Sequence, residues 1–69
     1  MLDQFELTTG ERKILHLMAR GYMNKQIARD QGVTEQVVKN HVSKIFRKLG
    51  ATNRLDAVIK ASQRGIVQI

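Results

Sequence analysis

The stretch that decides the fold covers residues 27–49 and reads IARDQGVTEQVVKNHVSKIFRKL. Its small and apolar residues have the spacing of two helices joined by a tight turn. Ala28 is small enough for the next helix to cross closely, and Gly32 supplies the positive φ that the turn requires. Val33 and Val38 are placed to fill the angle between the helices. This spacing is typical of a helix-turn-helix, but by itself it fits an ordinary helical hairpin equally well.

The second half of this stretch, residues 35–49, forms a helix with two different sides. The side that we expect to be buried is apolar and has Phe46 and His41 at its edges; it consists of Val38, Val42, Ile45 and Leu49. The opposite side is polar and basic, with Gln36, Asn40, Ser43 and Arg47 at its centre and Val37, Lys39 and Lys44 beside them. A helix-turn-helix inserts its second helix into the DNA major groove, so this chemistry favours that motif over a plain hairpin.

Capping signals divide the rest of the chain. Thr8 and Glu11 form a capping-box pattern, while Asn24, Thr34 and Asn53 are suited to begin later helices. Helix ends are marked by glycines at positions 21, 32, 50 and 65. The sequence therefore predicts an all-α domain with four helices, at about residues 9–20, 25–31, 35–49 and 54–64.

The positive charge of the chain lies in its second half. The 69 residues have a formal net charge of +6. Residues 1–38 contain five basic and five acidic side chains, whereas residues 39–69 contain seven basic side chains and one acidic one, Asp56. A field of this kind attracts polyanions, which leaves nucleic acid and an anionic membrane surface as candidate partners.

The composition argues against several classes of protein. The chain has no Cys, and His16 and His41 have no carboxylates near them in sequence, so we expect no disulfide, no metal site and no cofactor. Paired carboxylates, a nucleophile with its base and a phosphate-binding glycine loop are missing, which argues against an enzyme. No apolar run approaches the roughly 18 to 20 residues that span a bilayer, and the acidic N-terminus differs from a signal peptide. We expect a cytoplasmic protein.

Four segments together resemble the LuxR-type (FixJ/NarL-like) DNA-binding domain of bacterial transcription regulators. They are Leu7-Thr8-x2-Glu11-x2-Ile14-Leu15, Gly21-x2-Asn24-Lys25-x-Ile27-Ala28, Val38-Lys39-Asn40-His41-Val42-Ser43-x-Ile45-x2-Lys48-Leu49-Gly50 and Asn53-Arg54-x2-Ala57. The resemblance implies a four-helix fold in which the third helix enters the major groove and the fourth forms a dimer contact on DNA. The sequence departs from the family pattern at Gly10, Gln31 and Val37, where Arg, Leu and Thr are usual.

The resemblance and the polar side of residues 35–49 together assign candidate DNA contacts. We expect base contacts from Lys39, Asn40 and Ser43, because Lys donates to guanine and Asn pairs with adenine. Contacts to the DNA backbone are expected from Asn24, Lys25, Thr34, Gln36, Lys44, Arg47 and Lys48. We expect His16 at the surface and His41 packed and hydrogen-bonded. An ion pair between Glu11 and Arg54 is a further hypothesis, with Glu11 acting only as a cap as the alternative.

The predicted helix at 54–64 has two apolar sides, of which one must face the core. Small alanines allow close approach, so we assign the core side to Ala57, Val58 and Ala61. The other side, with Leu55, Ile59 and Ser62, is surplus to a monomer, and we expect it to be the homodimer contact.

These observations predict sequence-specific binding of double-stranded DNA by residues 7–69, with residues 1–6 as a linker or N-terminal extension. The resemblance implies the output domain of a bacterial regulator, acting as a dimer on DNA, with RNA polymerase as a further partner. A C-terminal part of a two-component response regulator is the first expectation; a stand-alone or ligand-sensing regulator of the same family is the alternative. The competing class is a membrane-surface or protein-binding module. Residues 35–49 have no bulky apolar edge left for lipid, so we expect no membrane partner.

Overall fold

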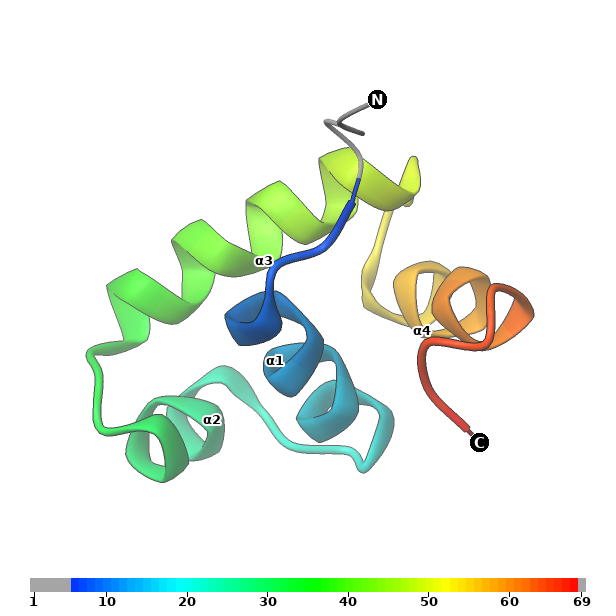
Figure 1. Cartoon of the computed structure of the whole chain (residues 1–69). Helices are drawn as coiled ribbons and strands as arrows, with labels where there is room; N and C mark the ends of the chain where they lie inside the picture. Colours follow the sequence, from blue (N-terminus) through cyan, green and yellow to red (C-terminus); the bar gives the residue numbers. More distant parts are fainter. Residues whose placement is uncertain (1–5, 69) are drawn as a thin grey trace.

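The computed structural model describes residues 6–68, so the expected linker falls, except for Glu6, outside the described residues. These residues form four helices and no strand, as predicted (Figure 1). The helices are α1 (Thr9–Ala19), α2 (Asn24–Gln31), α3 (Glu35–Leu49) and α4 (Arg54–Gln63). Each predicted boundary lies within one residue of the observed one.

Three of the four expected N-caps are confirmed. The Thr8 hydroxyl accepts a hydrogen bond from the Glu11 backbone N–H at 3.1 Å, and the Thr8 N–H donates to Glu11 Oε1 at 2.9 Å, which completes the capping box. Thr34 Oγ1 accepts from the Val37 N–H at 3.2 Å at the start of α3. Asn53 caps α4 in the same way.

Asn24 is not the cap that the sequence suggested. It is the first residue of α2, and Met23 occupies the N-cap position with its N–H donating to Gln26 Oε1 at 2.7 Å. The Asn24 carboxamide oxygen instead accepts a hydrogen bond from Arg54 Nη1 at 2.8 Å. A partner 30 positions away in sequence thus replaces the expected local interaction.

The turn between α2 and α3 has the predicted backbone. Gly32 ends α2 with a φ of 68°, in the left-handed region that favours glycine. The Val33 N–H then donates to the Ala28 carbonyl at 3.0 Å, which closes the turn. Val38 and Ala28 are buried between the helices, but the Val33 side chain is 40% exposed. The expectation that Val33 fills the angle is wrong, because the closed turn leaves its side chain on the outside.

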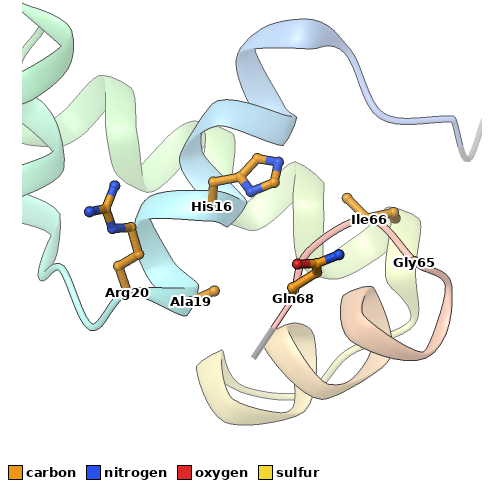
Figure 2. Close-up of a pocket in the computed structure, with 6 residues that line it drawn as sticks. All are labelled: His16, Ala19, Arg20, Gly65, Ile66 and Gln68. Carbon is orange, nitrogen blue, oxygen red and sulfur yellow. The ribbon is translucent and has the colours of Figure 1, made fainter.

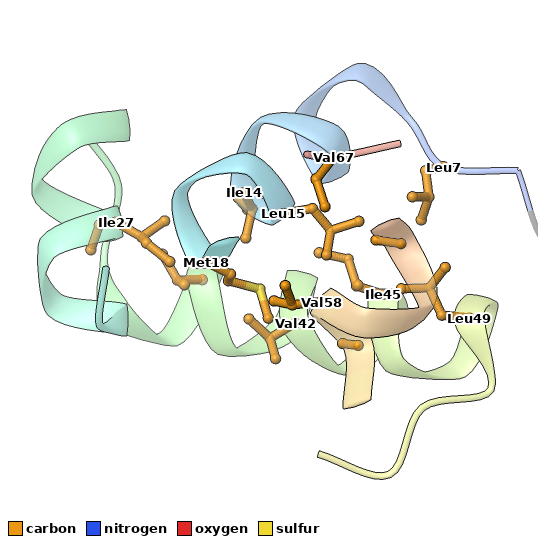
Figure 3. Packing of buried hydrophobic residues seen from close by; sticks show 14 residues of the cluster. Leu7, Ile14, Leu15, Met18, Ile27, Val42, Ile45, Leu49, Val58 and Val67 are labelled. Carbon is orange, nitrogen blue, oxygen red and sulfur yellow. The ribbon is translucent and has the colours of Figure 1, made fainter. Parts of the chain in front are cut away.

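The core lies between the inner side of α1 and the other helices, and α3 packs against all three of them (Figure 3). Its most completely buried large side chains are Leu15, Ile27, Val38 and Ile45. Ile14 and Met18 from α1, Val42 and Leu49 from α3, and Val67 near the C-terminus complete the same cluster. This packing fixes one side of α3 inward and therefore presents its other side to solvent.

Candidate nucleic-acid interface

The outer face of α3 consists of the side chains that the sequence assigned to it. The apolar side of the helix is buried, as predicted, through Val38, Val42, Ile45 and Leu49. After Glu35, the exposed acidic residue that begins the helix, the exposed residues of α3 are Gln36, Val37, Lys39, Asn40, Ser43, Lys44 and Arg47, and we call these seven the α3 outer face. Figure 1 shows that α3 runs along one side of the domain.

The basic groups of the α3 outer face are not neutralised by the rest of the described chain. Lys39, Lys44 and Arg47 form no ion pair within residues 6–68, where the two ion pairs are Lys48–Glu11 and Lys60–Asp56. The only polar contact between side chains on this face joins Gln36 Nε2 to Asn40 Oδ1 at 3.1 Å. This exposed hydrogen bond can be exchanged for one to a ligand at small net cost.

Two further candidate backbone contacts are exposed outside this face. Thr34 uses its hydroxyl oxygen as an acceptor for the cap of α3, which leaves the hydroxyl proton free to donate. Lys25 is exposed in the first turn of α2. Asn24 is different, because its carboxamide oxygen is already bound to Arg54 and its side chain is half-buried.

Lys48 is half-buried, and its ammonium is bound to groups of the same domain. Its ammonium donates to Glu11 Oε1 at 2.7 Å and to the Glu6 carbonyl at 3.2 Å, and the two side chains of the pair are 20% and 3% exposed. Burial alone would raise the pKa of Glu11, but the hydrogen bonds from Lys48 and Thr8 and the charge of Lys48 together lower it below its ordinary value. We therefore place Lys48 in a strap that ties α3 to the start of α1.

The expected ion pair between Glu11 and Arg54 is wrong. Glu11 is paired with Lys48, and the Arg54 guanidinium donates to Asn24 Oδ1 at 2.8 Å and to the Tyr22 carbonyl at 2.6 Å. Burial lowers the pKa of Arg54. Both residues do join distant parts of the chain, but through different partners: Glu11 joins α1 to α3, and Arg54 joins α4 to the loop before α2.

The two histidines have different surroundings. His16 is exposed, as expected. His41 is half-buried, and its Nδ1 atom is buried without a hydrogen-bond partner among the described residues, so the expected hydrogen bond is not found. No group of three or more His, Asp or Glu side chains within residues 6–68 is arranged to hold a metal ion.

α4 carries two exposed apolar side chains outside the core. Ala57, Val58 and Ala61 are buried, which confirms the predicted core side. On the other side Leu55 is 69% exposed and Ile59 is 40% exposed, while Ser62 is half-buried. A groove of about 430 Å³ runs beside this face, and we call it the α4 groove; it is lined by Met18, Ala19, Gly21, Tyr22, Met23, Arg54, Leu55, Val58 and Ile59.

Four helices with a tight glycine turn before a basic, exposed third helix define a helix-turn-helix domain. Residues 6–61 match the model of the family described as bacterial regulatory proteins, luxR family. The chain belongs to this family. None of the helices formed by the described residues has the length and apolar character needed to cross a membrane.

Relatives of known structure and name agree with this assignment. The structure titled transcription factor GerE superimposes with a TM-score of 0.85 at 34% identity, covering 90% of this chain and 92% of that one. The transcriptional regulatory protein YdfI of Bacillus subtilis is 42% identical over 67 residues, which are 97% of this chain and 32% of YdfI. The response regulator protein VraR of Staphylococcus aureus is 45% identical over 62 residues, covering 90% and 30% of the two chains. The chain thus spans about a third of the length of these curated relatives.

Proposed function

We propose that this luxR-family domain binds double-stranded DNA in a sequence-specific manner, with α3 in the major groove. The observation that carries the proposal is the α3 outer face, where Lys39, Lys44 and Arg47 are exposed without counter-ions among the described residues. An α-helix fits the width of the major groove, and cationic side chains on it replace the counter-ions of the phosphates. The names of YdfI and VraR, which describe regulators, support the same function.

The side chains of this face divide into two roles. Lys39, Asn40 and Ser43 are the proposed base contacts, with Lys39 donating to guanine and the Asn40 carboxamide pairing with adenine after it releases Gln36. The proposed backbone contacts are Lys25, Thr34, Gln36, Lys44 and Arg47. Lys48 and Asn24 are less favoured as backbone contacts, because the Lys48 ammonium is bound to Glu11 and the Asn24 carboxamide oxygen accepts from Arg54.

We further propose that two copies meet on DNA through Leu55, Ile59 and Ser62 of α4. The exposure of Leu55 and Ile59 beside the α4 groove supports this assignment, since a two-fold contact needs protruding and hollow parts on one surface. One short helix paired with its copy buries less than the roughly 1,200 Å² of a stable interface. The domain is therefore a monomer in solution, and two adjacent half-sites supply the effective concentration that the contact requires.

In the cell this domain is proposed to be the DNA-binding output of a transcription regulator in the bacterial cytoplasm, acting together with RNA polymerase. Response-regulator origin is favoured by the similarity to VraR, a response regulator about three times the length of this chain. A stand-alone or ligand-sensing regulator is the second candidate. The sequence next to this chain in its gene distinguishes them, since a phosphorylatable receiver domain there supports the first.

The test begins with selection of bound duplexes from a random-sequence pool, followed by mobility-shift titration of the selected site. A motif that enriches over successive rounds supports the proposal. The affinity for the selected site is then measured for two variants. Lys39→Ala removes one charge from the α3 outer face, and the control Lys13→Ala removes one charge from an exposed position on α1. Binding to anionic vesicles in co-sedimentation, without motif enrichment, would instead favour the membrane-surface alternative.

A further inference from the structure

The outer side of α1 carries a second group of basic residues that the proposed function does not use. Arg12, Lys13, His16 and Arg20 are all exposed, and at about 100° per residue they fall on one side of the helix. We call these four residues the α1 basic face. No ion pair joins them to any other described residue, and the only acidic side chain of α1, Glu11, is buried against Lys48.

This face is separate from the α3 outer face. Ile14, Leu15 and Met18 of α1 are buried in the core that α1 shares with α3, and the basic residues lie on the opposite side of α1. When α3 lies in a DNA groove, the α1 basic face is therefore turned away from that groove. Its charges are left for another acidic partner.

A hollow of about 520 Å³ adjoins the C-terminal end of this face. Figure 2 shows that α1 and the C-terminal segment form it together, from His16, Ala19, Arg20, Gly65, Ile66 and Gln68. Ala19 and Ile66 are half-buried and pack against the core, so they give the hollow an apolar component, while the Gln68 carboxamide adds a polar group. In Figure 2 the Arg20 side chain extends away from Gln68, so that its guanidinium points out of the hollow.

We propose that the α1 basic face and this hollow dock an acidic segment of a partner protein. Carboxylates of the segment pair with Arg12, Lys13 and Arg20, and one apolar side chain enters the hollow beside Ala19 and Ile66. The hollow favours a protein segment over a second DNA duplex, because a sugar-phosphate backbone has no apolar side chain to place there. The proposal does not depend on DNA binding by α3.

The test uses residue-resolved NMR titration of the isotope-labelled chain. The probe is a short blocked peptide of aspartates and glutamates with one central leucine, and a second peptide has glycine in place of the leucine. We expect saturable amide shifts at His16, Ala19, Arg20, Ile66 and Gln68, and weaker binding of the glycine peptide. The double variant Arg12→Gln with Arg20→Gln should lower the affinity for the leucine peptide at this site about fivefold, as expected for exposed charge pairs.

Matched variants and ligands decide the outcome. The double variant Lys39→Gln with Lys44→Gln removes the same charge from the α3 outer face and should leave the peptide-induced shifts at the α1 site unchanged. Arg20→Lys keeps the positive charge and should also retain these shifts. Because the substituted side chains are exposed, the dispersed amide spectrum should be preserved. The proposal is overturned if the shifts are confined to α3, or if loss of Arg12 and Arg20 leaves the affinity unchanged. It is also overturned if a random-sequence duplex, and not the peptide, shifts the α1 amides.

Discussion

The strap between Lys48 and Glu11 predicts an unequal loss of stability when either partner is removed. Lys48→Met leaves a carboxylate that is 3% exposed without its counter-ion. Breaking a fully buried pair costs about 3–5 kcal/mol, and since the Lys48 side chain is 20% exposed, entry of water reduces this to about 2 kcal/mol. For a domain of this size that loss lowers Tm by about 8–16 °C.

Glu11→Gln should cost less than Lys48→Met. A glutamine still accepts the Thr8 N–H of the capping box, and the long Lys48 side chain can turn its ammonium to water. We expect a loss of about 1 kcal/mol from this change. The double variant should be more stable than the sum of the two losses predicts, because the second change removes a group that the first left unpaired.

Urea and thermal denaturation followed by circular dichroism measure these differences, with Lys13→Met as the matched control. Lys13 is an exposed lysine of α1 without an ion pair among the described residues, so its removal should change stability by less than about 0.5 kcal/mol. Equal losses for Lys48→Met and Lys13→Met, or strictly additive losses in the double variant, would refute the strap.

Four further predictions concern pH, DNA and assembly. Because the folded-state pKa of Glu11 lies below its ordinary 4.5, its contribution to stability is complete above pH 4.5 and is lost as pH falls through the lowered pKa. Urea denaturation at a series of pH values below 5 should show this loss in the wild type and a smaller loss in Lys48→Met. Lys39→Ala and Asn40→Ala should each lose about 1–3 kcal/mol on a selected site and little on random DNA; equal losses on both would exclude base contacts. Arg47→Ala should weaken binding to all DNA sequences alike and lower the slope of log K against log salt by about one, whereas an unchanged slope would place Arg47 away from phosphate. Ile59→Glu should keep the fold and half-site affinity but abolish cooperative binding to paired sites in mobility shifts; retained cooperativity would rule out α4 as the contact.

The parts of the fold that follow from periodicity could be predicted from the sequence. Helix bounds and buried faces depend on local spacing and capping, which is why the inward side of α3 and the core side of α4, with Ala57 and Ala61, were predicted correctly. The exposure of the α3 outer face follows from the same periodicity. Its contacts with DNA stay predictions.

The contacts that sequence analysis missed join residues far apart in the chain through long side chains. Lys48 was assigned to phosphate because it lies on a basic helix, and its ion pair with Glu11, 37 positions away, was not predicted. Arg54 was assigned to the wrong partner for the same reason. A lysine or arginine reaches many places from one backbone position, so its partner depends on packing that periodicity does not encode.

The hydrogen bonds of Arg54 limit which parts of this domain can be transferred to another protein. The guanidinium connects the first residue of α4 to the Tyr22 carbonyl and to Asn24, just where α2 begins. The helix-turn-helix is therefore held from both sides, by α1 through the core and by α4 through Arg54. For protein engineering, α2 and α3 do not form a transplantable module by themselves. A change of specificity is best made by replacing exposed side chains of α3 in place, and the smallest portable unit is the whole four-helix domain.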